Sequence, residues 1–155
     1  MSTAAERLVA ELTRLGQTVA TAESLTAGLV CATLTEVPGA SAVVRGGLIV
    51  YATDLKQALA GVDGAVLAEH GAVHPEVAAQ LAEGARTRCG ADWGLGLTGV
   101  AGPDPQDGVP PGTVYVGLAG EGVRVTRRLQ VSGNRSAVRA ASVTAAFDLL
   151  GEQLG

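Results

Sequence analysis

The alternation of helix and strand patterns along the chain is the feature that most constrains its fold. Apolar residues recur at helical spacing near the start, run together as in a strand over residues 18–22, and continue in this succession through most of the 155 residues. Only the strand patterns over residues 113–119 and 123–131 follow one another directly, and the Gly-Glu-Gly turn between them makes them antiparallel neighbours. This order predicts an α/β fold, a three-layer α/β/α sandwich around a mixed, mostly parallel five-stranded sheet. We expect one domain over residues 1–155.

Capping and turn residues set the expected boundaries of these elements. Thr3 with Glu6 begins a helix that Gly16 ends, and Asp54 is expected to cap a short helix over residues 55–60. Further helices are expected over the segment that follows Ser24 and ends near Thr35, over residues 65–70, from Pro75 onward and from Asn134 onward. Further strands are expected over residues 43–51, with a bulge near Gly46 and Gly47, and over residues 92–98.

The composition indicates how these layers pack. Hydrophobic residues make up 47% of the chain but aromatic residues only 3%, so the core is built from Ala, Val and Leu, whose small side chains let helices approach a sheet closely. In the strand over residues 92–98, Gly94, Gly96 and Thr98 leave one face bare for such a helix. The last helix carries apolar residues on two sides, and we expect one of these sides to face another subunit.

Charge and cysteine usage exclude several classes of function. The formal net charge of −4 argues against general nucleic-acid or anionic-membrane binding. No apolar run reaches the length of a membrane span, and the first residues read as an amphipathic helix rather than a signal peptide. Cys31 and Cys89 fit no metal-binding spacing, and His70 and His74 have no further ligand at metal spacing, so we expect reduced thiols, no metal and a cytoplasmic location.

Ser24 is the first candidate for chemistry. It directly follows a strand pattern, and α/β proteins place ligands at this carboxyl edge of the sheet. If a helix begins here, the amides of Thr26, Ala27 and Gly28 lie at its N-terminus and can stabilise an oxyanion. The alternative, in which Ser24 or Thr26 only caps the helix, stays open on these grounds.

Tyr51 and Lys56 form the second candidate. Tyr51 ends a strand pattern, and Lys56 lies in the first turn of the next helix, where the helix dipole disfavours its charged form. Partial burial would lower the pKa of Lys56 further, as a lysine general base requires. An exposed lysine beside a core tyrosine is the alternative.

A glycine- and proline-rich loop and three arginines are candidates for substrate contacts. Thr98, Gly99 and Gly102 stand where a strand passes into the long loop ending at Gly112, and small residues there let backbone amides approach a ring or a phosphate. Arg135 and Arg139 are four residues apart near a helix N-terminus and suit a phosphate, although a solvated helix face is the alternative. Arg45 is a further possible phosphate contact.

Together these segments resemble the CinA C-terminal domain family, the nicotinamide-nucleotide amidases. The resemblance spans nearly the whole chain and rests on TAESLTAG (21–28), RGGLIVYATDLKQALAGV (45–62), HGAV (70–73), GLTGVAGPD (96–104), PPGTVYVGLA (110–119) and SGNRSAVR (132–139). Ala27 departs from the commonest pattern by standing where glycine is frequent, which matters only if the backbone there needs a positive φ. His74 stands at a position often held by serine, and we expect it to cap its helix.

The resemblance implies hydrolysis of nicotinamide mononucleotide to nicotinate mononucleotide and ammonia. It implies Ser24 as nucleophile, Lys56 as base and Tyr51 assisting, with no metal or organic cofactor and usually a dimer. Glu23 is expected to orient the site through hydrogen bonds. A function of a different class stays open, namely a nucleotide-binding or regulatory module, related to competence or DNA damage, that keeps the pocket and lacks hydrolysis.

Overall fold

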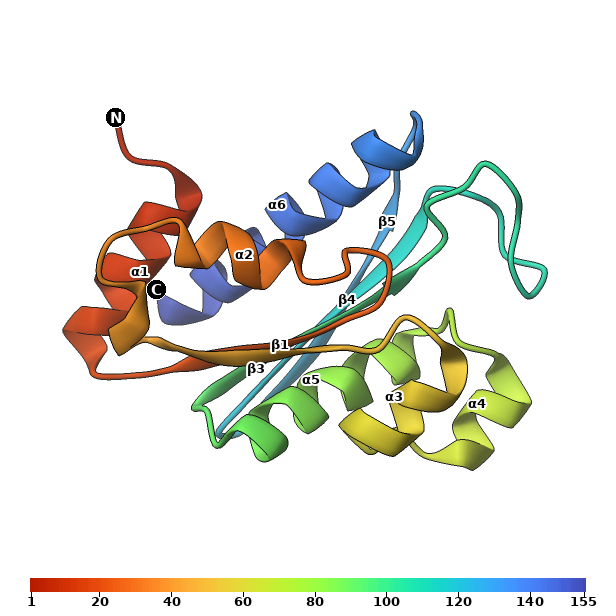
Figure 1. Ribbon diagram of the computed structural model, residues 1–155, viewed down its shortest axis with the longest axis horizontal. Coiled ribbons are helices and arrows are strands. Elements are labelled where there is room, and N and C mark those ends of the chain that lie inside the picture. Colours follow the sequence, from red (N-terminus) through yellow and green to blue (C-terminus); the bar gives the residue numbers. More distant parts are fainter.

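The five strands form one twisted sheet in the order β2-β1-β3-β4-β5 in this computed structural model, which describes residues 1–155 (Figure 1). The strands are β1 (Val19–Glu23), β2 (Val44–Ile49), β3 (Trp93–Gly99), β4 (Thr113–Gly120) and β5 (Val123–Gln130). The pairings of β1 with β2 and β3 are parallel, whereas β4 is antiparallel to both β3 and β5. All strands except β4 therefore point the same way, which confirms the predicted mixed, mostly parallel sheet.

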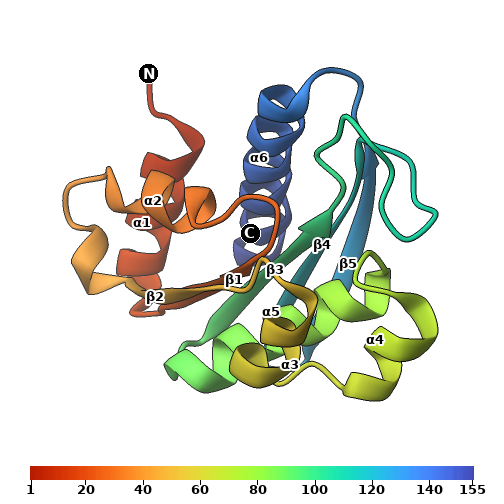
Figure 2. The same ribbon diagram turned by 45° about the vertical axis from the view of Figure 1, so that its right-hand side comes forward.

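Helices cover both faces of the sheet, so the predicted three layers are confirmed (Figures 1 and 2). One face is covered by α1 (Ala4–Leu15), α2 (Leu29–Thr35) and α6 (Arg135–Leu154), and the other by α3 (Thr53–Ala60), α4 (Gly64–His70) and α5 (Pro75–Cys89). A short 3-10 helix, Ala40–Ala42, connects α2 to β2. No helix is both long and apolar enough to cross a membrane.

Most predicted helix boundaries follow from their capping residues. Thr3 accepts a hydrogen bond from the Glu6 amide, Gly16 ends α1 in the left-handed conformation, and the side chain of Asn134 caps α6. His74 caps α5 as expected, through Nδ1, which accepts from the Glu76 amide at 3.1 Å. The prediction for Asp54 is wrong, because α3 begins at Thr53 and Asp54 lies inside its first turn.

Helix α5 packs against the bare glycine face of the sheet. A Cβ atom added to Gly94 would lie 2.0 Å from the Ala82 carbonyl oxygen, and one added to Gly96 would lie 2.4 Å from that of Ala78. Gly117 on β4 approaches the same Ala78 oxygen, with a built Cβ at 2.3 Å. The expected close helix approach is confirmed, and it places the start of α5 beside the carboxyl end of β3.

We therefore expect Gly96→Ala to destabilise the protein strongly. A methyl group there would meet the backbone of α5 rather than a flexible side chain, and overpacking of this kind costs about 1–3 kcal/mol or more. Gly151→Ala in α6 is the matched control, because its Cβ would meet only Leu8 at 3.8 Å and alanine favours a helix by about 0.8–1 kcal/mol. Denaturant unfolding of both variants measures the difference, and equal stabilities would contradict the packing argument.

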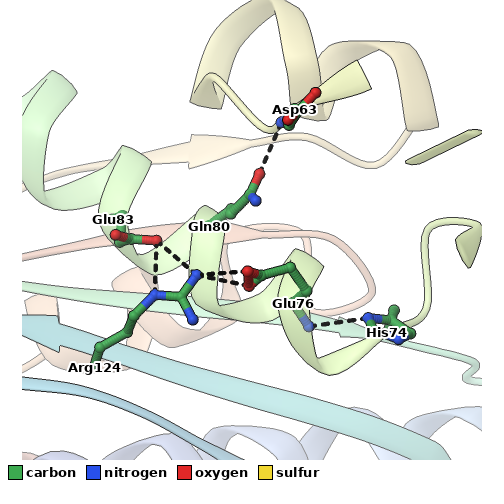
Figure 3. A network of polar contacts seen from close by, with 6 residues as sticks. All are labelled: Asp63, His74, Glu76, Gln80, Glu83 and Arg124. Carbon is green, nitrogen blue, oxygen red and sulfur yellow. Dashed lines mark hydrogen bonds and ion pairs between the residues drawn. The ribbon is translucent and has the colours of Figure 1, made fainter. Parts of the chain in front are cut away.

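Polar contacts on the outer side of α5 connect it to β5. Arg124 of β5 lies between Glu76 and Glu83 of α5, with Nη2 2.6 Å from one Glu76 oxygen and 3.1 Å from Glu83 (Figure 3). These side chains are partly exposed, so each pair contributes little stability by itself. The network therefore connects α5 to β5 at the surface and adds little to the free energy of unfolding.

The two apolar sides of α6 are both covered within the chain. Val143, Phe147 and Leu150 are buried in the same core cluster as Leu8 and Leu12 of α1. The expectation that one side of α6 faces another subunit is therefore wrong, because α1 packs there. A dimer has no support from α6 and stays a prediction of the family resemblance.

Candidate active site

A cavity of about 670 Å³ lies at the carboxyl ends of β1 and β3, beside the segment that follows β2. Its size falls within the usual range for small-molecule sites, roughly 300–1,000 Å³. The lining residues are Ser24, Leu25, Tyr51, Ala52, Thr53, Ala72, Thr98, Gly99, Val100, Ala101, Gly102, Pro103, Asp104, Pro105, Gln106 and Arg135. The topology thus places the first strand junction, the segment after β2 and the long loop, three segments that the sequence analysis selected separately, around one space.

Ser24 and Lys56 are in direct contact at this cavity. The Lys56 Nζ atom lies 2.9 Å from the Ser24 hydroxyl oxygen, 2.9 Å from the Val50 carbonyl oxygen and 3.1 Å from that of Tyr51. Only 1% of Lys56 is exposed, although it is 32 residues from Ser24 in sequence. A buried lysine is uncommon unless its amine is paired, and here all its partners are neutral oxygens.

This environment lowers the pKa of the Lys56 amine, so that more of it is neutral, and able to accept a proton, near pH 7. Burial lowers the pKa of Lys56 to about 8, and the carboxylate of Asp107 opposes part of that effect. A lysine with an ordinary pKa near 10.5 would be protonated almost completely at pH 7. At a pKa of about 8, roughly a tenth of the molecules carry a neutral amine at pH 7.

The segment after Ser24 is a turn rather than the start of a helix. Ala27 has a φ of 47° and Gly28 a φ of 97°, both left-handed, and α2 begins only at Leu29. The Ala27 amide donates to the Ser24 carbonyl oxygen at 3.1 Å, so it is not free for an oxyanion. Thr26, Ala27 and Gly28 do not line the cavity, whereas Leu25 does. The expected oxyanion site at a helix N-terminus is therefore wrong, because the turn displaces the helix.

The N-terminus of α2 is occupied by Glu23 instead. The Glu23 carboxylate is fully buried and accepts hydrogen bonds from the amides of Val30 and Cys31 and from the hydroxyl of Thr21. A carboxylate is favoured there by the helix dipole and the unpaired amides. Glu23 lies behind Ser24 and does not line the cavity, in keeping with its expected orienting contacts but not with substrate contact.

Tyr51 lies at the cavity but away from the Ser24–Lys56 contact. Its hydroxyl accepts from Arg135 Nη2 at 2.8 Å, and 57% of the residue is exposed. The Tyr51 carbonyl oxygen, not its hydroxyl, contacts Lys56. The geometry therefore does not support the expectation that the hydroxyl carries the proton between Ser24 and Lys56.

The three candidate arginines have different positions. Arg135 lines the cavity and donates to the Gly102 carbonyl oxygen at 2.7 Å. Arg139 instead donates to the carbonyl oxygens of Leu25 and Thr26, at 3.0 and 3.2 Å, and does not line the cavity. Arg45 donates to the Cys89 carbonyl oxygen near the amino end of β2, which is the opposite end of the sheet. Arg135 is the only one of the three that the structure places for a substrate contact.

The start of the long loop lines the cavity, and a later residue of the loop makes a contact that the sequence did not suggest. Thr98, Gly99 and Gly102 all line the cavity, and the Thr98 hydroxyl donates to the Ala72 carbonyl oxygen at 2.7 Å. The amide of Ala72 lies 3.4 Å from a carboxylate oxygen of Asp107, within reach of a hydrogen bond. Asp107 has a φ of 50° and precedes Gly108, a turn signal that could have identified it. Ala72 and Asp107 were not among the residues that sequence reasoning selected.

Groups of three or more side chains suited to hold a metal ion are absent from the structure. The rings of His70 and His74 stack with centroids 4.0 Å apart, and the pKa of His74 is lowered by burial and by His70.

Comparison with known proteins identifies the family of the chain. The family model for the CinA C-terminal domain matches residues 1–154. The chain belongs to the CinA C-terminal domain family. A CinA-like protein of Frankia casuarinae is 48% identical over 143 residues, which cover 92% of this chain and 33% of that protein. The chain spans about a third of the length of the curated relatives that it matches.

Solved structures of CinA proteins share the whole fold. The competence/damage inducible protein CihA of Agrobacterium tumefaciens is 33% identical, with a TM-score of 0.93 and coverage of 98% of both chains. A competence or damage-inducible protein of Enterobacter asburiae is 28% identical, with a TM-score of 0.95 and coverage of 98% of this chain and 96% of that one. These names describe induction and competence, and they state no reaction.

Proposed function

We propose that this CinA domain is an amidohydrolase that converts nicotinamide mononucleotide to nicotinate mononucleotide and ammonia. The observation that carries the proposal is the 2.9 Å contact between the Ser24 hydroxyl and the buried amine of Lys56 at the cavity. A serine beside a neutral base is the arrangement that acyl transfer needs. The choice of this carboxamide substrate comes from the resemblance to nicotinamide-nucleotide amidases.

Neutral Lys56 is oriented to remove the Ser24 proton. Its two N–H bonds donate to the carbonyl oxygens of Val50 and Tyr51, which leaves the nitrogen lone pair directed at the Ser24 hydroxyl. As Lys56 takes the proton, the Ser24 oxygen attacks the carboxamide carbon and forms a tetrahedral intermediate. The protonated amine then donates all three of its N–H bonds to the same three oxygens, so little rearrangement is needed.

Breakdown of the intermediate uses the same proton. Lys56 returns the proton to the departing nitrogen, ammonia leaves, and an ester joins Ser24 to the nicotinoyl group. Water, deprotonated by Lys56, then attacks this ester, and Ser24 regains its proton as nicotinate mononucleotide is released. Over both steps the carbon–nitrogen bond of the carboxamide breaks and a carbon–oxygen bond to the oxygen of water forms, with no change in oxidation state.

The amide of Leu25 is the best placed donor for the oxyanion. Leu25 lines the cavity, and its N–H donates to no backbone carbonyl oxygen. The residue after a nucleophilic serine supplies such a donor in other serine hydrolases. This assignment replaces the helix N-terminus that the sequence suggested.

Arg135 is expected to bind the phosphate of the mononucleotide. The chain is acidic overall, so an anionic substrate needs a local cation, and Arg135 is the only cationic side chain that lines the cavity. We expect Arg135→Ala to raise KM for the mononucleotide roughly 10- to 100-fold, equivalent to about 1.5–3 kcal/mol for a lost charge-assisted contact. KM for the dephosphorylated riboside should change much less.

Steady-state kinetics on both substrates provide the measurement. Arg127→Ala is the control, because Arg127 pairs with Glu152 on the α6 side of the sheet and does not line the cavity. Equal losses on mononucleotide and riboside would show that Arg135 supports the loop through Gly102 rather than the phosphate.

Ammonia release from nicotinamide mononucleotide by the purified protein tests the proposal as a whole. Free nicotinamide and nicotinamide riboside serve as comparison substrates. Binding of the mononucleotide without any ammonia release would contradict the amidohydrolase and favour a binding or regulatory module.

A further inference from the structure

The turn that carries Ser24 is held from outside the cavity by one side chain of α6. Arg139 donates from Nε to the Leu25 carbonyl oxygen at 3.0 Å and from Nη2 to the Thr26 carbonyl oxygen at 3.2 Å. Arg139 is 113 residues from Thr26 in sequence, and nothing in the proposed chemistry uses it. Its guanidinium binds two successive carbonyl oxygens of the turn, immediately after the nucleophile.

These bonds determine where the amides of the turn point. In a planar trans peptide the N–H points away from the C=O of the same unit. The Ser24 carbonyl oxygen accepts from the Ala27 amide, so the N–H of Leu25 points away from that bond. The Leu25 carbonyl oxygen accepts from Arg139, so the N–H of Thr26 points away from α6.

The peptide unit between Thr26 and Ala27 shows the same opposite orientation of C=O and N–H. The Thr26 carbonyl oxygen faces Arg139, and the Ala27 N–H of the same peptide unit does point the other way, to the Ser24 carbonyl oxygen at 3.1 Å. The N–H groups of Leu25 and Thr26 donate to no backbone oxygen. Of these two residues only Leu25 lines the cavity, so its amide is the one available to an anion there.

The backbone of the turn has a left-handed conformation at two successive residues. Ala27 has a φ of 47°, a conformation that residues with a Cβ disfavour, and Gly28 follows with a φ of 97°. The Thr26 hydroxyl is buried without a hydrogen-bond partner, so this hydroxyl does not hold the turn. A planar guanidinium with several N–H donors can bind both carbonyl oxygens together, which an ammonium group does less well.

We propose that Arg139 is a positioning residue, which fixes the turn after Ser24 so that the amide of Leu25 is directed to the oxyanion of the acyl-transfer step. The inference rests on the proposed function for its reaction, but its geometry depends only on the turn and α6. Arg139 touches neither the substrate nor the reacting atoms. Its removal therefore lowers the rate of the chemical step and leaves ground-state binding nearly unchanged.

The first test separates kcat from KM. Arg139→Ala is expected to lower kcat for ammonia release about 10- to 100-fold, less than the roughly 100- to 1,000-fold that loss of an oxyanion donor itself costs, with KM within about twofold of wild type. Arg139→Lys should recover little of this loss, and millimolar methylguanidine should restore part of kcat to Arg139→Ala. Arg127→Ala removes an arginine that also pairs with α6, through Glu152, and should change neither constant.

The second test does not need turnover of nicotinamide mononucleotide. A fluorophosphonate probe reacts with an activated serine, and mass spectrometry can report the rate at which Ser24 is labelled. We expect labelling to be at least about tenfold slower in Arg139→Ala than in wild type and Arg127→Ala, since the probe also develops an oxyanion. Labelling that depends on Arg139, in a protein that releases no ammonia, would support the inference and contradict only the proposed substrate.

Folding of the variants is measured by circular dichroism and thermal unfolding. Arg139→Gln keeps an aliphatic stem and a single NH2 group in place of the guanidinium, so it provides a folded variant at the same position if Arg139→Ala unfolds. Unchanged kcat and labelling rates in a folded Arg139 variant would overturn the inference. A rise in KM with constant kcat would also overturn it, because that pattern indicates substrate contact.

Discussion

Ser24→Ala is expected to abolish ammonia release while leaving the fold and substrate binding nearly intact. The substitution removes the only oxygen that contacts Lys56 Nζ from a side chain, and with it the covalent route. Loss of a serine nucleophile costs about 10³-fold or more in kcat in other hydrolases. Lys56 keeps the carbonyl oxygens of Val50 and Tyr51 as partners, so its position should change little.

The measurement compares kcat of Ser24→Ala with that of Ser41→Ala, an exposed serine in the short helix before β2. Binding of nicotinamide mononucleotide to Ser24→Ala, followed by calorimetry, shows whether the pocket is intact. If the variant kept more than about a tenth of wild-type turnover, Ser24 could not be the nucleophile.

The general fold could be predicted from the sequence because it depends mainly on local patterns. The order of helices and strands depends on periodicity and on end residues such as Thr3 and Gly16, which act within one turn of the chain. The close approach of α5 depends on Gly94 and Gly96, whose missing side chains are visible in the sequence itself. The meeting of Ser24 with Lys56 follows from topology, since both lie just beyond the carboxyl ends of the adjacent parallel strands β1 and β2.

The details of the site are harder to predict because they depend on which of several possible hydrogen-bond partners each side chain contacts in the folded protein. Arg135 and Arg139 look equivalent in the sequence, four residues apart on one helix. Only the fold shows that the carbonyl oxygens of Leu25 and Thr26 bind Arg139, whereas Arg135 is left at the cavity. The turn after Ser24 is similar, because alanine itself gives no sign of a left-handed backbone, and only the glycine frequent at position 27 in the family pointed to the positive φ that Ala27 has.

The effect of Asp107 on Lys56 is a further feature that could not be predicted from the sequence. It acts on Lys56 through space, across 51 positions of the sequence, by raising a pKa that burial lowers. No spacing rule connects a loop carboxylate to a helix lysine. The base strength of Lys56 is thus a property of the folded cavity rather than of either segment.

Lys56→Arg is expected to be almost as inactive as Lys56→Met. Arginine keeps the positive charge but does not lose its proton near neutral pH, so it cannot accept the Ser24 proton. Methionine has a similar length and no charge, which makes it the matched control for the buried space that Lys56 fills. Near-normal turnover of Lys56→Arg would show that the residue supplies charge alone.

The pH dependence of the wild type follows from the same residue. The pKa of Lys56 is lowered to about 8 by burial, and only the neutral amine can act as base. The rate constant kcat/KM should therefore rise with pH, level off above about 8, and fall about tenfold per pH unit well below it. In a Lys56→Ala variant supplied with small primary amines, the rescued rate should instead follow the pKa of the added amine. A flat wild-type profile between pH 6 and 9, the range bracketing a pKa of about 8, would contradict the assignment of Lys56 as the general base.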